Sequence, residues 1–200
     1  MLRLLLFSVF TSLFVGGQAQ TAQDTCSQLI NSLQLPSDVT LILTQPYPDN
    51  TTFQDPFSLS FPQPVPSLPA FCRVYANIST SPTSRTLFEV WLPLKQWNLR
   101  YLTVGNGGAA GGVNYPSMGV GLRAGFAVAS TDTGHNSSVI DGAWIALGPE
   151  VNIDFGFRAV HLTIVYAKSI TKQFYGRGIY HSYYAGCSSG GYNFEFSCGC

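Results

Sequence analysis

One serine in the sequence stands between glycines at a spacing that suits nucleophilic chemistry. Gly186, Ser188 and Gly190 form a Gly-x-Ser-x-Gly pattern, with Cys187 directly before the serine. Glycines two positions on either side let the backbone make a sharp, strained turn that lifts the hydroxyl above a sheet. A serine held there can act as a nucleophile. The other interpretation is an ordinary turn, because glycine and serine are common in loops.

A serine nucleophile needs a base within hydrogen-bond reach, and histidine is the usual one. The sequence has three histidines, His135, His161 and His181. All precede Ser188, whereas in chains with this serine turn the acid and then the histidine follow the nucleophile. We expect His161 to be a packed core residue of a helix and His181 to be a structural residue of the strand before the turn. A catalytic His135 would require a different chain order.

A glycine-rich loop at residues 105–112 follows an earlier apolar strand and is the second candidate for a chemical role. An ester hydrolase needs backbone N–H groups aimed at the developing oxyanion, and removing one such donor costs about 3 kcal/mol. We expect the N–H groups of Gly107 or Gly108 to serve, together with that of Ser189, the residue after the nucleophile. The alternative is a flexible or phosphate-cradling loop, but Ala110 breaks the spacing of a dinucleotide fingerprint.

Strands and helices are expected to alternate along the chain in the way that builds an α/β sheet. Short apolar runs, typical of buried parallel strands, lie at residues 39–44, 71–78, 87–93, 100–104, 125–130 and 179–185. Helices are expected at residues 21–35, 115–122 and 154–174. Asp154 is expected to cap the last helix and Gly176 to end it. Residues 45–70 are rich in proline, so we expect a surface loop with at most short strand pieces.

The composition excludes several classes of protein. Only 10% of the 200 residues are charged, and ten basic residues balance ten acidic ones. We expect neither a nucleic-acid partner nor binding to an acidic membrane surface. The sequence Cys198-Gly199-Cys200 is one residue too tight for the usual zinc spacing and has no second pair, so we expect no metal site. The length suggests one domain, or one domain with a piece missing.

The N-terminus predicts export. Residues 1–19 combine a short basic start, an apolar run too short for a membrane span, and small residues before an expected cleavage after Ala19. Three glycosylation sequons, at Asn50, Asn77 and Asn136, support a secreted, extracellular protein.

Five cysteines in a secreted chain indicate disulfide chemistry rather than metal binding. Cys26 and Cys72 are expected to pair and to tie down the N-terminal segment. Cys187 lies in the serine turn, and Cys198 and Cys200 lie at the end of the sequence. Because five is odd, at least one cysteine is expected to be unpaired or to have its partner elsewhere.

Four segments, taken in order, resemble the secreted tannase and feruloyl esterase family. They are residues 102–112 (LTVGNGGAAGG), 126–135 (FAVASTDTGH), 155–161 (FGFRAVH) and 183–191 (YYAGCSSGG). The resemblance implies that residues 20–191 are the N-terminal part of an α/β-hydrolase fold without its last strands and its lid domain. It also implies a carboxylic ester hydrolase. Its substrate would be a small-molecule or polysaccharide-linked phenolic ester of an aromatic acid, of feruloyl or galloyl type.

The resemblance also implies roles for single residues. Ser188 matches the family nucleophile, and Cys187 matches a cysteine that in the family is bonded to one beside the catalytic histidine. In the family that histidine, the acid and a lid with a structural calcium ion lie downstream, so the partner of Cys187 is absent and no cofactor is expected here. Residues 192–200 do not resemble the family segment that follows, so we expect an aberrant tail and little or no turnover by the chain as written.

Two other classes of function are compatible with parts of the sequence. A secreted, non-catalytic module that binds carbohydrates or phenolics would explain the aromatic residues and the sequons. Its ligand binding would be indifferent to Ser188→Ala. A structural or interaction protein would explain the odd cysteine through a disulfide between two chains.

Overall fold

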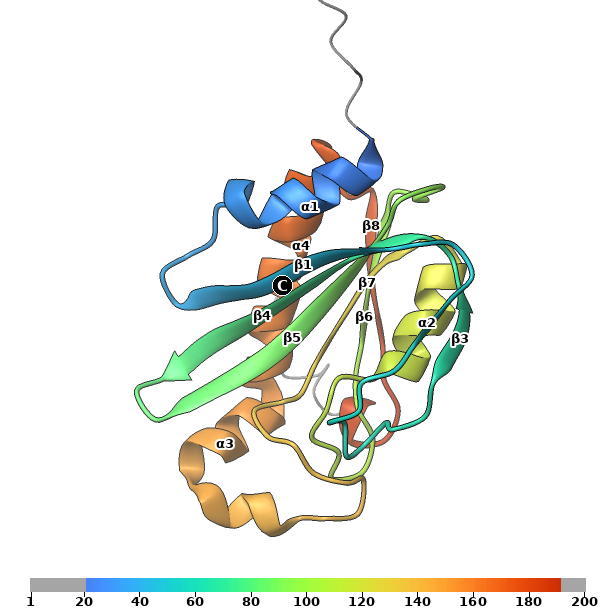
Figure 1. The fold of residues 1–200 in the computed structure, drawn as a ribbon. Helices are drawn as coiled ribbons and strands as arrows, with labels where there is room; N and C mark the ends of the chain where they lie inside the picture. The colour runs from blue at the N-terminus through green and yellow to red at the C-terminus, as the bar shows by residue number, and fades with distance from the viewer. Residues whose placement is uncertain (1–20, 192–200) are drawn as a thin grey trace, which may run out of the picture.

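Six strands form one mixed, twisted sheet with helices on both faces in the computed structural model, which describes residues 21–191 (Figure 1). The order across the sheet is β1-β4-β5-β7-β6-β8. The bounds are β1 Val39–Tyr47, β4 Phe71–Ser81, β5 Ser84–Pro93, β6 Arg100–Val104, β7 Ala127–Thr131 and β8 His181–Ala185. The strands β7, β6 and β8 run parallel, as the apolar runs suggest.

The first half of the sheet is antiparallel, which differs from the parallel arrangement indicated by the apolar runs. The strands β1, β4, β5 and β7 pair antiparallel in that order. Only two residues separate the end of β4 from the start of β5. A connection this short makes a hairpin, whereas parallel neighbours need a long crossover.

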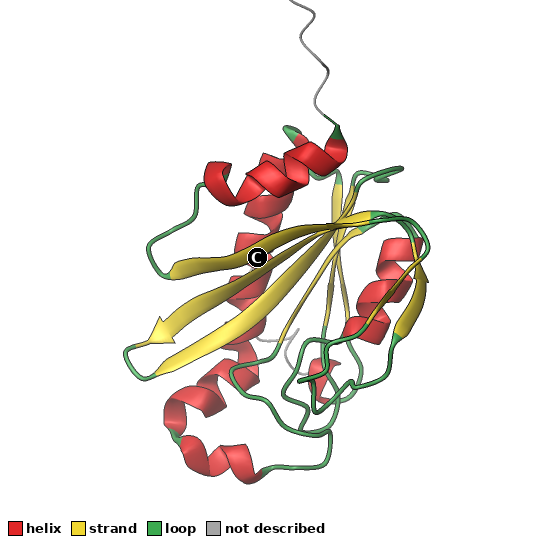
Figure 2. Cartoon of the chain, viewed as in Figure 1, coloured by secondary structure: helices red, strands yellow, loops and turns green. Residues whose placement is uncertain are grey.

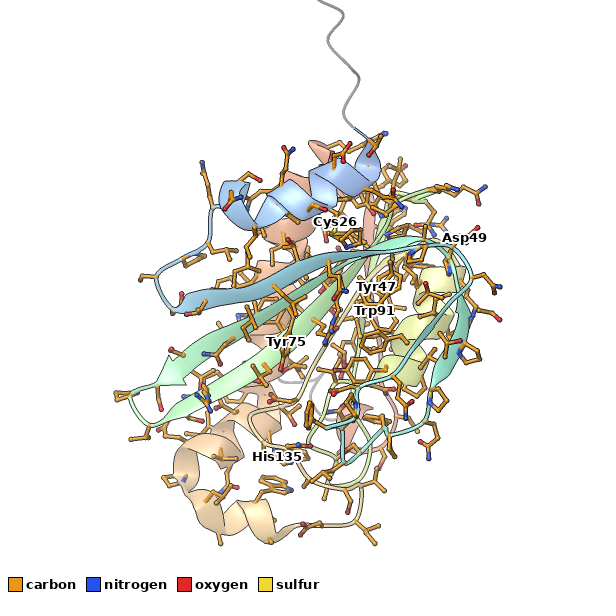
Figure 3. All side chains as sticks on the ribbon, viewed as in Figure 1. Cys26, Tyr47, Asp49, Tyr75, Trp91 and His135 are labelled. Atoms are coloured by element: carbon orange, nitrogen blue, oxygen red, sulfur yellow. A yellow bond between two sulfur atoms is a disulfide. The ribbon has the colours of Figure 1, made fainter. Side chains whose placement is uncertain are left out.

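Two helices cover one face of the sheet (Figure 2). Helix α1, Ala22–Ser32, begins at a capping box in which Thr21 and Asp24 exchange hydrogen bonds. Helix α4, Ala159–Tyr175, ends at Gly176, which adopts the left-handed conformation expected of it. Buried apolar residues of both helices join the strand side chains in one core cluster. The expected disulfide between Cys26 and Cys72 is present and fixes α1 to β4 (Cys26 is labelled in Figure 3).

The opposite face is covered by helix α2, Tyr115–Arg123, and a small two-stranded sheet of β2, Thr51–Phe53, and β3, Val65–Leu68. These short strands are the pieces allowed for within residues 45–70. Trp91, labelled in Figure 3, is fully buried in the second core cluster. Next to it the buried Glu89 accepts hydrogen bonds from Arg73, Trp91 and Tyr115. Because every partner is a donor, the carboxylate is paired rather than orphaned.

The connection from β7 to α4 holds more helix than the sequence indicates. It contains the 3₁₀ helix η1, Ala143–Leu147, then α3, Pro149–Ile153, and the π-helical turn η2, Asp154–Arg158. The expectation that Asp154 caps the long helix is wrong. Its buried carboxylate instead pairs with Arg158 and accepts hydrogen bonds from the hydroxyls of Thr80 and Ser84. Asp154 therefore ties this connection to the β4–β5 hairpin.

Two expectations of burial are also wrong. The strand β8 was expected to be buried, but it is an edge strand that pairs only with β6 among the described residues, and four of its five side chains are exposed. His161 was expected in the core, but it is exposed. The buried face of α4 is formed by Ala159, Val160, Thr163, Ala167, Ile170 and Thr171, and position 161 falls outside this stripe of three- and four-residue spacing.

The predictions for residues 1–19 and 192–200, which include the signal peptide, the tail and its two cysteines, lie outside the described residues. Within residues 21–191 no helix has the length and apolar character needed to cross a bilayer.

Candidate active site

The carboxyl ends of β6 and β8 meet where the chain reverses its direction across the sheet. From β6 the chain crosses through α2 to β7 on one side, and from β7 it returns past β6 through α4 to β8 on the other. In open α/β sheets such a reversal leaves a crevice at the carboxyl ends, where ligands bind. A cleft of about 680 Å³ lies here, lined by both glycine-rich turns and by the apolar residues Phe61 and Val139.

The serine turn has the strained geometry expected of a nucleophile. Ser188 has φ of 57° and an exposed side chain. A non-glycine residue with positive φ is uncommon, and such strain gathers at functional sites. The chain becomes helical at residues 189–191, the last that are described. The turn therefore joins a parallel strand to the start of a helix, which is the setting that favours a nucleophile over an ordinary turn.

The glycines around Ser188 are required by close backbone contacts. A Cβ atom on Gly190 would overlap the carbonyl oxygen of Asn106, and one on Gly186 would overlap the carbonyl oxygen of Gly190. The hydroxyl of Tyr184 donates to that same Gly190 oxygen at 2.5 Å. A Cβ on Gly105 would in turn overlap this hydroxyl. The serine turn and the glycine loop thus touch through their backbones, which only glycine permits.

The hydrogen bonds within the glycine loop show which of its N–H groups are available. Four of them donate to backbone carbonyls: those of Gly105, Ala109, Ala110 and Gly111. The N–H groups of Asn106, Gly107 and Gly108 donate to no group among residues 21–191. All three residues line the cleft. The two glycines named from the sequence are therefore among the loop donors that an oxyanion could use.

His135 supports the glycine loop (Figure 3 shows it among the loops below the sheet). Its Nε2 lies 3.3 Å from the carbonyl oxygen of Ala109, and its ring stacks on Trp144 with centroids 4.1 Å apart. A side chain on Gly111 would overlap the imidazole. Burial lowers the pKa of His135, against the opposing effect of its backbone hydrogen bonds. The buried imidazole thus supports the loop through its contacts with Ala109, Trp144 and Gly111.

None of the three histidines is placed as the base of Ser188. The Nε2 of His135 is engaged with Ala109. His161 lies on the exposed side of α4. His181 is the first residue of β8, opposite Arg100, and the whole strand, at about 3.3 Å per residue, separates it from the turn. Its ring contacts Tyr180 and Tyr183 instead.

Cys187 is a free, exposed cysteine among the described residues, and it lines the cleft. No cluster of three or more histidine, cysteine or acidic side chains within residues 21–191 is arranged to hold a metal ion.

The three sequons differ in how accessible their amides are. Asn50 is exposed in the turn between β1 and β2, with φ of 61°. Asn77 lies within β4, which has neighbours on both sides, and its Oδ1 is buried. The amide of Asn136 donates to the carbonyl of Phe57 at 3.0 Å and accepts from the N–H of Leu59 at 3.3 Å. Glycosylation stays a prediction for all three, and Asn50 is the most accessible.

Asp132 fixes the loop that carries His135. Its Oδ1 accepts hydrogen bonds from the Thr86 hydroxyl and from the N–H groups of Leu87 and Gly134, at 2.7 to 2.9 Å. Burial raises the pKa of Asp132 to about 6 from a usual 3.8, although these hydrogen bonds oppose the rise.

A raised folded-state pKa means that folding favours the protonated carboxyl. The stabilising contribution of Asp132 is complete below pH 3.8 and is lost as the pH rises to about 6. We expect Asp132→Asn, which keeps the accepting oxygen, to remove this decline. Urea unfolding of both proteins at several pH values between 4 and 6 measures it. A constant difference in unfolding free energy across that range would contradict the prediction.

Two residues that build this site had no role assigned from the sequence. Asn106 is buried, and its Nδ2 donates to the carbonyls of Ala110 at 3.3 Å and Thr131 at 3.2 Å, which joins the loop to β7. Tyr184, in β8, donates a hydrogen bond from its hydroxyl to the carbonyl of Gly190. An asparagine within a glycine run was the available signal for the first. Nothing in the spacing marks the second.

Comparisons with known proteins identify the family and the fold of the chain. Residues 72–194 match the family model "Tannase and feruloyl esterase". The "Probable feruloyl esterase B-1" of Aspergillus oryzae is 41% identical over 128 residues, 64% of this chain and 23% of the relative. The "Probable feruloyl esterase B" of Aspergillus clavatus is 33% identical over 196 residues, 92% of this chain and 35% of the relative. The chain thus spans about a third or less of the length of these relatives.

Solved structures show the same fold. The crystal structure of feruloyl esterase B from Aspergillus oryzae superposes with a TM-score of 0.78 at 32% identity, over 86% of this chain and 34% of that chain. The tannin acyl hydrolase from Aspergillus niger superposes with a TM-score of 0.64 over 88% of this chain and 34% of that chain. At 23% identity it supports the fold alone. The sheet and its helices are accordingly part of an α/β-hydrolase fold, and the chain belongs to the tannase and feruloyl esterase family.

Proposed function

We propose that this chain carries the nucleophile and the oxyanion-binding groups of a secreted carboxylic ester hydrolase. The observation that supports this most strongly is Ser188. It stands at positive φ on a strand-to-helix turn, beside a cleft lined by three loop residues whose N–H groups donate to no group within residues 21–191. Five other non-glycine residues in the described part of the chain also have positive φ, so Ser188 is distinguished by its position beside the cleft and the glycine loop as well as by its backbone conformation.

The proposed reaction is acyl transfer in two steps. The Ser188 oxygen attacks the ester carbonyl, its proton passes to a base, and the carbonyl oxygen becomes an oxyanion held by N–H groups of Gly107 or Gly108 and of Ser189. Collapse of this intermediate releases the alcohol and leaves the acyl group on Ser188. Water then attacks the acyl-serine and releases the acid, with Ser188 regenerated.

The proposed substrates are esters of aromatic acids of feruloyl or galloyl type. Relatives that match the chain are named feruloyl esterases, and the cleft offers Phe61 and Val139 as apolar walls for a ring. Export is supported by the buried disulfide between Cys26 and Cys72, by the N-terminal segment and by the sequons.

Within residues 21–191 no histidine lies where it could act as the base of Ser188, so the assay must supply a base. Hydrolysis of an activated ester, 4-nitrophenyl ferulate, is followed with the 200-residue chain at increasing imidazole concentration, because free imidazole can replace a missing base. We expect little turnover without imidazole and about a tenfold or larger rise with it, a part of what a positioned base contributes.

The matched control for this test is Ser188→Ala. Imidazole alone also cleaves such esters, so the variant reports the background at each concentration. The proposal predicts that the rise above this background disappears in the variant. Equal rates for both proteins at every imidazole concentration would contradict it.

A further inference from the structure

A side-chain hydrogen bond joins the serine turn to the glycine loop beside the cleft. The hydroxyl of Ser189 donates to the carbonyl oxygen of Gly108 at 2.8 Å, between residues 81 positions apart in the sequence. Ser189 follows the proposed nucleophile, and Gly108 is one of the three loop residues whose N–H groups donate to no group within residues 21–191. The bond therefore links the two sources of oxyanion donors.

This bond fixes the orientation of a peptide unit. The carbonyl of Gly108 is held by Ser189, and the N–H of Ala109, at the other end of the same peptide, donates to the carbonyl of Val139 at 2.8 Å. Gly108 itself has φ of 64°, and a Cβ atom there would overlap the Val139 oxygen. The planar peptide between Gly108 and Ala109 is therefore held at both its carbonyl and its N–H. This restricts the direction in which the N–H of Gly108, in the preceding peptide, can point.

The inner side of the loop is held by other groups. The carbonyl of Ala109 faces three donors: the Ser137 hydroxyl at 2.9 Å, the Trp144 indole at 3.2 Å and the His135 ring at 3.3 Å. The Asn106 amide adds bonds to Ala110 and Thr131. These contacts fix the loop against β7 and the 133–144 segment, whereas the Ser189 hydroxyl fixes it against the turn that carries the nucleophile.

We propose that the Ser189 hydroxyl is a positioning group that sets the spacing between the oxyanion donors of the serine turn and those of the glycine loop. The inference rests on the proposed function and assigns the side chain of Ser189 a role separate from that of its N–H. Loss of the hydroxyl should weaken binding of a tetrahedral anion at Ser188 without removing any of the donors.

A boronic acid tests this role without a catalytic base. In phenylboronic acid the Ser188 oxygen adds to boron, a B–O bond forms, and the hydroxyl proton leaves to solvent. Boron then becomes tetrahedral and negatively charged and keeps both hydroxyls, so that one of them lies where the oxyanion would. The dissociation constant is measured by titration at fixed pH, and ¹¹B NMR identifies the tetrahedral species.

We expect Ser189→Ala to bind phenylboronic acid about three- to tenfold more weakly, the loss of one ordinary hydrogen bond. Ser189→Thr keeps a hydroxyl and is expected to restore affinity to within about twofold on the same basis. Melting temperatures of both variants are measured in parallel. If Ser189 had only a structural role, its replacement would lower the melting temperature, but Ser189→Ala and Ser189→Thr would bind phenylboronic acid equally well.

The outcomes separate this inference from the proposed function. Ser188→Ala should form no tetrahedral adduct. If the unmodified chain also forms none, the proposed function fails and this inference with it. If the unmodified chain and Ser189→Ala form the adduct with equal affinity, the proposed function stands and the positioning role of Ser189 is wrong.

Discussion

Gly190→Ala is expected to reduce acylation of Ser188 by about 100-fold, since a displacement of about 1 Å in a reacting group can cost that much. The Cβ atom would overlap the carbonyl oxygen of Asn106 and approach its nitrogen and carbon at 3.2 Å. These are backbone atoms, and the Asn106 amide is itself tied to β7 through Thr131. The serine turn must therefore move away from the glycine loop, which separates the nucleophile from the oxyanion donors.

The neighbouring glycine provides a matched control for this variant. A Cβ atom on Gly191 would meet no atom of the described residues within 4 Å. Gly191→Ala should retain acylation within about twofold, since a substitution in open space is usually tolerated. The rate of 4-nitrophenol release from 4-nitrophenyl ferulate with imidazole present measures both variants. Equal rates for Gly190→Ala and Gly191→Ala would show that contact between the turn and the loop does not position the nucleophile.

Removing the disulfide is expected to lower the free energy of unfolding by about 4 kcal/mol, the chain-entropy value for a loop of this length. Cys26 and Cys72 are separated by 46 positions, and both are fully buried. Replacement of both by alanine frees α1 from β4 in the unfolded ensemble without leaving a thiol. In a domain of this size the melting temperature should fall by about 8 to 16 °C.

Cys187→Ala is the control for the disulfide variant. Cys187 is exposed and has no disulfide partner within residues 21–191, so its replacement should change the unfolding free energy by no more than about 0.5 kcal/mol. Thermal unfolding followed by circular dichroism measures both proteins. A double variant as stable as the unmodified chain would mean that α1 holds its place through the packing of Leu29 and its neighbours alone.

The sequence predicts the local backbone features of this site better than the burial and the side-chain partners of its helices and strands. The glycine pattern around Ser188 and the run at residues 105–112 predict the two turns that line the cleft, because close backbone approach requires glycine. Gly176 is likewise the end of α4. Each of these depends on backbone geometry within a few residues, which residue type largely determines.

Burial and partners depend on the tertiary arrangement and were predicted less well. An apolar strand such as β8 has the same composition whether it lies inside a sheet or at its edge. Asp154 has the residue type of a helix cap, but its carboxylate pairs with Arg158 instead. It also accepts hydrogen bonds from Thr80 and Ser84, which lie 74 and 70 positions away in the sequence. The spacing of residues in the sequence likewise does not predict the hydrogen bonds from the side chains of Asn106 and Ser189 to distant backbone carbonyls.

The most direct test of the central claim is to identify the acylated residue. The chain is incubated with 4-nitrophenyl ferulate in the presence of imidazole, quenched in acid, and examined by intact-mass and peptide-mapping mass spectrometry. The proposal predicts one feruloyl group, located on Ser188, absent in Ser188→Ala and retained in Cys187→Ala. A feruloyl group on the neighbouring Cys187, or one that persists in Ser188→Ala, would contradict the assignment of Ser188 as the nucleophile.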